Sequence, residues 1–195
     1  MGAQQEVSVS KGASPPGTIV VQFTGQQHSW QYEVTPGHSS IHLLSEGEIA
    51  DPVRASSADA PVPSLGPFIH CKDSPQVLSP NRTFLARCIL NGERERLVVT
   101  PSNASSSILE WEGHEWRGIA AFAWSPDSEW VAVLNESEHF RKDPLGIFAA
   151  LSGHPIPHST VFLTLVNVRT HSVAEYVVRK NVLYLLYPTI VRWTE

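Results

Sequence analysis

The chain has 195 residues, 42% of them hydrophobic, and a formal net charge of −5 at pH 7. This apolar content is enough for the core of one domain, so disorder of the whole chain is excluded. The 14 basic residues form no run, which argues against nucleic-acid binding. Because no apolar stretch is as long as a membrane span and the first ten residues are polar, we expect no membrane contact, no signal peptide and a cytoplasmic location.

The first 48 residues divide into a tail and a set of strands. Residues 1–17 are expected to form a flexible tail, since glycine, serine and proline dominate its second half. Three runs of β-forming residues follow, separated by Gly25 and by the Pro36-Gly37 pair, and they predict an N-terminal β-meander over residues 18–48. These runs are residues 18–23, 28–34 and 40–44.

Residues 49–67 are dense in alanine, serine and proline. Their prolines remove backbone donors at short intervals, so a regular ladder of hydrogen bonds is not expected there. The segment is predicted to be a linker. Residues 68–195 are expected to form the main β-domain.

An internal repeat is the most informative feature of that domain. The sequence AFAWSPDSEWVAVL at residues 121–134 is echoed by PQVLSPNRTFLARC at residues 75–88. Proline sets the second position of a tight turn, and the Asp or Asn side chain that follows bonds to the local backbone. Each copy therefore predicts a strand, a tight turn and a second strand.

Each copy extends into four predicted strands, and one more strand ends the chain. The first copy gives residues 75–78, 84–90, 96–100 and 106–111, and the second gives residues 119–124, 130–134, 161–168 and 172–178. Residues 189–193 look like the first strand of a third copy. Because an exposed apolar edge strand invites pairing, we expect this strand to pair with the N-terminal meander or across a homodimer.

One short helix is predicted inside the second copy. Asp143 can cap a first turn that Pro144 begins, and Gly153 suits the position after the helix. The insertion that holds it, residues 137–159, is long for a connection in a compact domain. We expect the helix to act as a lid that packs on the loops through Leu145, Phe148 and Leu151.

The repeat resembles that of the TolB-type, WD-like β-propellers, in which a WSPDG turn joins the first two strands of a blade. WSPDS at residues 124–128 carries the resemblance, and LSPN at residues 78–81 is a weaker copy. Ser128 stands in place of the family's glycine, and Leu78 in place of its tryptophan. The resemblance implies an all-β, mainly antiparallel fold of propeller-like blades. Two blades do not close a ring, so either the meander and last strand complete a compact stack, or chains assemble, or the sequence belongs to a larger ring.

A four-stranded meander places every second connection at the same end of its sheet. Residues 91–95, 112–118, 137–159 and 179–187 should therefore share one face, and long charged and aromatic loops on a rigid scaffold are typical of binding sites, although ordinary solvated loops would look similar. We expect a non-enzymatic interaction module that binds a partner protein through this face. The expected binding residues are Glu112, His114, Glu115, Trp116, Arg117, His139, Arg141, Lys142, Phe148, His154 and His158.

The alternative is a hydrolase, or an accessory domain of one, with His114 and Glu115 as an acid-base pair. Sequence neighbours on a strand point to opposite faces, and no nucleophile motif accompanies the pair. His154 and His158 have a metal-like spacing, but the prolines between them favour an extended backbone that separates the rings. No phosphate or dinucleotide motif is present, so neither a metal nor a cofactor is expected.

Cys71 and Cys88 flank the Ser79-Pro80 turn almost symmetrically. On a hairpin they would lie within about one residue pair of facing each other, so a bridge is conceivable. Reduced thiols are the favoured interpretation, since cytoplasmic cysteines stay reduced.

Overall fold

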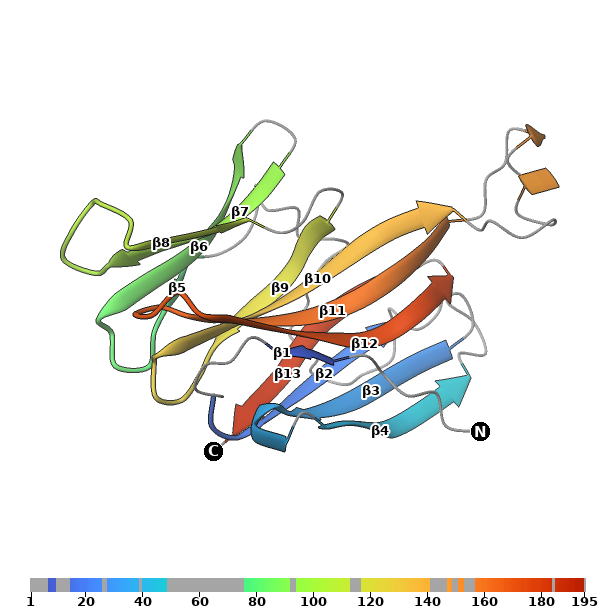
Figure 1. Ribbon diagram of the computed structural model, residues 1–195, viewed down its shortest axis with the longest axis horizontal. Coiled ribbons are helices and arrows are strands. Elements are labelled where there is room, and N and C mark those ends of the chain that lie inside the picture. The colour runs from blue at the N-terminus through green and yellow to red at the C-terminus, as the bar shows by residue number, and fades with distance from the viewer. Residues whose placement is uncertain are drawn as a thin grey trace, which may run out of the picture.

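The computed structural model describes most of the chain as strands of three antiparallel sheets (Figure 1). It describes residues 7–9, 15–25, 28–38, 40–48, 76–91, 94–112, 117–140, 147–148, 151–152, 157–183 and 185–194. The expected all-β, mainly antiparallel fold class is confirmed.

Each sheet is a run of neighbouring antiparallel strands. Sheet A has the order β1 (Val7–Val9), β12 (Val173–Leu183), β11 (Pro157–Asn167), β10 (Trp130–Phe140) and β9 (Arg117–Trp124). Sheet B has the order β13 (Leu186–Thr194), β2 (Thr18–Thr24), β3 (His28–Thr35) and β4 (Ser40–Glu48), with the short 3-10 helix η1 (Pro36–His38) between β3 and β4. Sheet C has the order β5 (Val77–Leu78), β6 (Phe84–Asn91), β7 (Arg94–Pro101) and β8 (Leu109–Glu112).

The strands expected from the sequence are all present, and β1 is the one that was not expected. Val7–Val9 pairs with β12, so this part of the predicted flexible tail is a strand. Three residues are too few to carry a periodic signal, which explains why the sequence did not reveal it.

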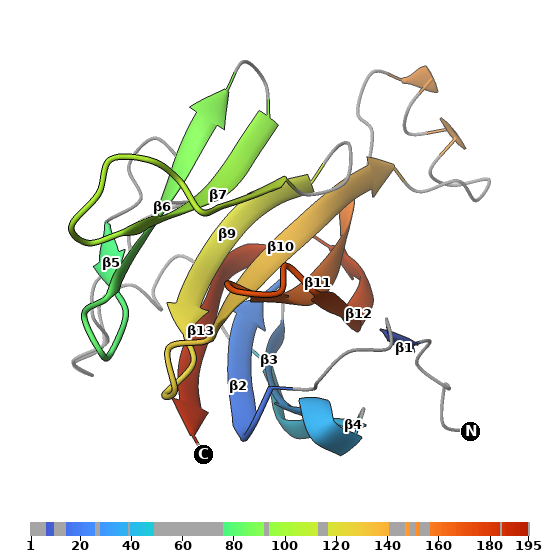
Figure 2. The same ribbon diagram turned by 60° about the vertical axis from the view of Figure 1, so that its left-hand side comes forward.

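Sheet A lies between the other two sheets, as the ribbon shows from two directions (Figures 1 and 2). Alternate residues of β10 supply its two faces: Trp130, Ala132 and Leu134 pack in the core shared with sheet B. Val131 and Val133 pack in the core shared with sheet C. This alternation follows from the period of two in a strand, and it gives the chain two apolar layers that share one sheet.

Sheet B combines the N-terminal meander with the last strand of the chain. Its first strand, β13, pairs with β2, and the partners include Ile190 with Val21 and Trp193 with Ile19. Figure 2 shows β13 beside β2. The expectation that the last strand pairs with the N-terminal meander is therefore confirmed, and the pairing is the one that completes a compact stack.

The two Ser-Pro turns of the repeat have the same hydrogen bonds. The Ser79 hydroxyl donates to the Asn81 carboxamide oxygen, and the Ser125 hydroxyl donates to the Asp127 carboxylate. Each serine oxygen also accepts from the amide of the residue five positions later, at 3.1 Å in the first turn and 2.9 Å in the second. The turns touch, because the Asn81 amide donates to the Ser128 hydroxyl at 3.1 Å. The sequence repeat is thus a structural repeat.

Cys88 lies in the core between sheets A and C and is disulfide-bonded. Cys71, the other cysteine of the sequence, lies outside the described residues. The favoured interpretation of two reduced thiols is therefore wrong for this structure. It rested on the assumed compartment.

We expect Arg82→Gly to stabilise the fold by about 0.5 to 1 kcal/mol. Arg82 has a φ of 60° and Ser128 has a φ of 64°, the left-handed region that glycine adopts without strain. Ser128→Gly should give a smaller gain, because it also removes the acceptor of the Asn81 amide. Urea unfolding of both variants measures the difference. An Arg82→Gly variant no more stable than the parent chain would contradict the argument.

Candidate interaction surface

The strand registers place the long connections at one end of the sheets. In sheet A, Ser137 of β10 is opposite Arg117 at the start of β9, and Phe140 is opposite Pro157 at the start of β11. In sheet C, β6 ends at Asn91, opposite the start of β7. We call this the long-loop end; it holds the connections 92–93, 113–116, 141–156 and 184–185, and the Ser-Pro turns lie at the other end.

The predicted binding residues are only partly described. Side chains are described for Glu112 on β8, for Phe148 in the connection between β10 and β11, and for His158 on β11. Only the backbone is described for Arg117 on β9 and His139 on β10. His139 and His158 are directly opposite each other across the β10–β11 pair. The remaining predictions lie outside the described residues, namely His114, Glu115, Trp116, Arg141, Lys142 and His154. The acid-base pair of the hydrolase alternative is among them.

The second-copy insertion is shorter than the sequence suggested. β10 continues to Phe140 and β11 begins at Pro157, so the connection covers residues 141–156 instead of 137–159. Its described residues Ile147, Phe148 and Leu151 are helical, and the Ser152 amide donates to the Phe148 carbonyl at 3.0 Å. A short helical turn at the expected place is therefore present.

This turn does not pack on the loops as the lid interpretation required. Ile147, Phe148 and Leu151 are 53%, 72% and 83% exposed. Their spacing of one, three and four residues places them close together on a helical turn. Leu145, the other expected contact, lies outside the described residues. The turn thus presents a small apolar surface to solvent at the long-loop end.

Glu112 is the centre of an ion network on sheet C. Its two carboxylate oxygens accept from Arg94 at 2.8 Å and from Arg96 at 2.7 Å, and Glu110 lies 3.8 Å from Arg96. The hydrogen bond from Arg94, assisted by Arg96, lowers the pKa of the Glu112 carboxyl below its ordinary value. Such a carboxylate stays ionised and paired, so Glu112 is suited to holding the two arginines in place.

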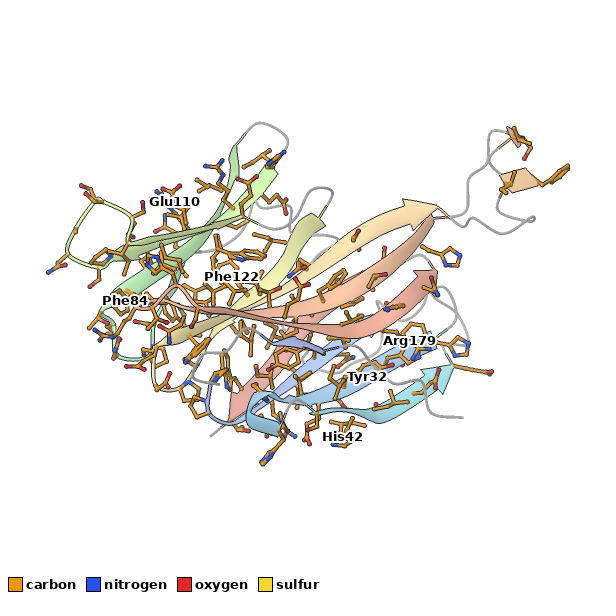
Figure 3. The ribbon with its side chains drawn as sticks, in the orientation of Figure 1. Tyr32, His42, Phe84, Glu110, Phe122 and Arg179 are labelled. Atoms are coloured by element: carbon orange, nitrogen blue, oxygen red, sulfur yellow. The ribbon has the colours of Figure 1, made fainter. Side chains whose placement is uncertain are left out.

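A second cluster, which the sequence did not reveal, joins sheets A and B. The Arg179 guanidinium of β12 lies 4.3 Å from the ring centroid of Trp30 and donates to the Tyr32 hydroxyl at 2.5 Å. The Trp30 indole donates to Glu46 at 2.7 Å, and Glu46 lies 3.8 Å from Arg179. Figure 3 shows Tyr32 and Arg179 beside each other between the sheets. Trp30 and Tyr32 are buried, while the Arg179 side chain is 31% exposed.

A β-bulge explains how Arg179 reaches this position. Val161 is opposite Arg179, but Phe162 is opposite Val177, so Val178 is the extra residue. Val178 packs in the core between sheets A and B, and Arg179 contacts sheet B as well. In a regular strand these neighbours would face opposite ways. Asn181, with a φ of 58°, lies at the next register shift of β12, between the pairs of Ser159 and Val161, and asparagine tolerates the left-handed region.

We expect the stabilisation by Glu112 to disappear in acid. A carboxyl whose pKa is lowered by folding stabilises the fold above its ordinary pKa and loses this contribution as the pH falls through the lowered value. Glu112→Gln should therefore reduce the melting temperature at pH 7 and have little effect at pH 3. A melting-temperature difference that is the same at both pH values would refute the pairing.

We expect Tyr32 and Arg179 to be energetically coupled by about 1 kcal/mol, since a charged donor meets a hydroxyl at a partly buried site. Urea unfolding of Tyr32→Phe, Arg179→Gln and the double variant measures this coupling. Glu112→Gln, on sheet C, is the matched control and should combine additively with Arg179→Gln. If the effects of Tyr32→Phe and Arg179→Gln also add, the contact between these two residues contributes nothing to the free energy of unfolding.

Among the described residues, no group of His, Cys, Asp and Glu is arranged to hold a metal ion, and no helix is long and apolar enough to cross a membrane. No family model and no curated protein matches the chain. The crystal structure of the uncharacterized protein lmo1340 from Listeria monocytogenes EGD-e aligns with 93% of this chain and 56% of its own, at 8% identity and a TM-score of 0.27. The chain thus spans little more than half of that protein.

Proposed function

We propose that this chain is a non-enzymatic interaction module that binds a partner protein through the long-loop end. The observation that carries the proposal is the exposed apolar turn at residues 147–151. Scattered single apolar residues on a surface are ordinary, but three that share one helical turn are unusual without a binding role. An apolar turn of this kind fits a groove on a partner, in the manner of other helix-in-groove contacts.

The rest of the long-loop end supports the same proposal. Leu90, near the end of β6, is 53% exposed, and the two arginines that bind Glu112 lie on the neighbouring strand β7. Apolar, aromatic and arginine side chains are all common in protein interfaces. In this proposal, the scaffold that carries the long-loop end consists of propeller-like blades with a TolB-type repeat.

The expected cytoplasmic location is not part of the proposal. Cys88 is disulfide-bonded, and disulfides persist mainly in oxidising compartments. A homo-oligomer formed by the last strand is not part of it either, because β13 pairs with β2 of the same chain.

The test is quantitative capture of binding proteins from an extract of the source cells. Phe148→Ser combined with Leu151→Ser should reduce capture of the specific partner at least tenfold, which is the effect of removing about 1.4 kcal/mol of binding energy. Both side chains are exposed, so the fold should be unaffected. Trp116→Ala combined with Arg117→Ala examines the neighbouring connection in the same way.

Leu78→Ser is the matched control. Leu78 is 50% exposed and lies beside the Ser-Pro turn, at the opposite end of the sheets. It should leave capture unchanged. An equal loss of capture with the control variant, or no loss with the Phe148 and Leu151 variant, would show that the binding surface does not lie at the long-loop end.

A further inference from the structure

Three asparagines of the chain stand in the pattern Asn-X-Ser/Thr, with X other than proline, that N-linked glycosylation requires. They are Asn81 in NRT, Asn103 in NAS and Asn135 in NES. Such triplets also arise by chance in a serine-rich chain, so the pattern alone decides nothing. A glycan is bulky and hydrophilic, and a folded protein carries one only where the asparagine side chain lies in solvent. The surroundings of the three side chains therefore distinguish them.

Asn103 lies in the connection between β7 and β8. The Ala104 amide donates to the Pro101 carbonyl at 3.1 Å, which makes Asn103 the third residue of a tight turn. Asn103, Ala104 and Ser105 are all exposed, and the Asn103 carboxamide makes no hydrogen bond to the described part of the chain. A sugar on its nitrogen would therefore displace no contact of the fold.

Asn81 is exposed in the first Ser-Pro turn, and this turn uses only its carboxamide oxygen. That oxygen accepts from the Ser79 hydroxyl at 2.8 Å, from the Thr83 amide at 3.0 Å and from the Thr83 hydroxyl at 2.6 Å. N-glycosylation replaces one hydrogen of the carboxamide nitrogen and leaves the oxygen as an acceptor. A glycan at Asn81 would thus preserve these three hydrogen bonds.

Asn135 has the opposite surroundings. Its side chain is buried on β10, with 1% of the residue exposed. The carboxamide nitrogen donates to the Thr164 hydroxyl at 2.9 Å and to the Val133 carbonyl at 3.4 Å. A sugar on this nitrogen would remove one of the two donors and force a large polar group into the packed interior. The folded protein therefore has no room for a glycan at Asn135, which makes this triplet an internal control.

The disulfide at Cys88 is an independent observation that bears on the compartment. Disulfides form and persist in the oxidising secretory route, which is also where glycans are attached to this asparagine pattern. Cys88 is 7% exposed and packs in the core between sheets A and C, so its bond belongs to the interior of the fold. The buried disulfide and the two exposed triplets thus indicate the same compartment.

We propose that Asn81 and Asn103 carry N-linked glycans, transferred by a glycosyltransferase from a lipid-linked oligosaccharide diphosphate. The carboxamide nitrogen forms a bond to the anomeric carbon of the first sugar and loses one proton to the enzyme. The bond from that carbon to the phosphate oxygen breaks, and the lipid diphosphate leaves.

Both asparagines lie at the end of sheet C that holds the Ser-Pro turn, where the Ser102 amide donates to the Thr83 carbonyl at 2.8 Å. Glycans there leave the long-loop end uncovered. The proposal is therefore compatible with a binding surface at that end and does not depend on it.

The test uses the full chain purified from its source cells. A peptide N-glycosidase removes the glycan and converts the asparagine to aspartate, which takes up the label when the water is enriched in heavy oxygen. Peptide mass spectrometry should find the label at Asn81 and Asn103 and not at Asn135. A sample kept in the same water without the glycosidase is the control for spontaneous deamidation.

Matched variants produced in the source cells identify each site in the intact protein. Ser105→Ala should remove the mass of one glycan, whereas Ser106→Ala, outside the triplet, should remove none. Both serines are exposed, so both variants should fold. Thr83→Ala should remove the other glycan, whereas Thr83→Ser, which keeps the hydroxyl of the pattern, should retain it.

Three results would overturn the proposal. The first is the absence of label at both Asn81 and Asn103, while its absence at one of them would reject that site. The second is label at Asn135, because burial would then not decide which triplets are modified. The third is alkylation of the Cys88 thiol without prior reduction, since the chain would then not reside in the oxidising compartment on which the proposal depends.

Discussion

The architecture depends on the apolar character of both faces of sheet A. In β10, the five consecutive residues from Trp130 to Leu134 are all buried, so neither face of the strand can meet water. A sheet of this kind needs a cover on each side. Sheet C precedes it in the chain and covers one face. The other cover, sheet B, is assembled from the N-terminal meander and the last strand, which makes the β13–β2 pairing a condition for the second core.

The outer faces of the two covering sheets are of a different kind. On sheet B, the residues that alternate with the core positions include Gln22, Gln31 and Glu33. On sheet C they include Arg96 and Glu112, which pair with each other. Val20 on sheet B and Val98 on sheet C also alternate with core positions and are buried, so these faces are only partly polar. The three sheets form a stack with two cores, while the propeller relationship of the repeat stays a prediction.

The sequence predicted those parts of the fold that local chemistry determines. The Ser-Pro-Asx turns gave the strands around them, and the apolar run of residues 189–193 gave the closing strand. The sequence could not reveal β1, since three residues carry no period. It also placed Arg179 only among the loops, because a bulge at Val178 changes the face of the strand and leaves almost no trace in the residue pattern. Reduced cysteines were expected because of the assumed compartment, and that prediction was wrong. At the candidate site, the helical turn was foreseen but its exposure was not, because exposure depends on how far β10 and β11 extend.

The Arg179 cluster and the exposed helical turn have different physical explanations. Arg179, Trp30, Tyr32 and Glu46 satisfy one another at the seam between sheets A and B, so fold stability alone accounts for them. The apolar turn of Phe148 and Leu151 has no such account: it adds no burial to either core, and its exposed side chains lower solubility. Exposed apolar side chains that contribute to neither core are a common feature of contact surfaces. The proposed binding surface therefore includes the turn and not the cluster around Arg179.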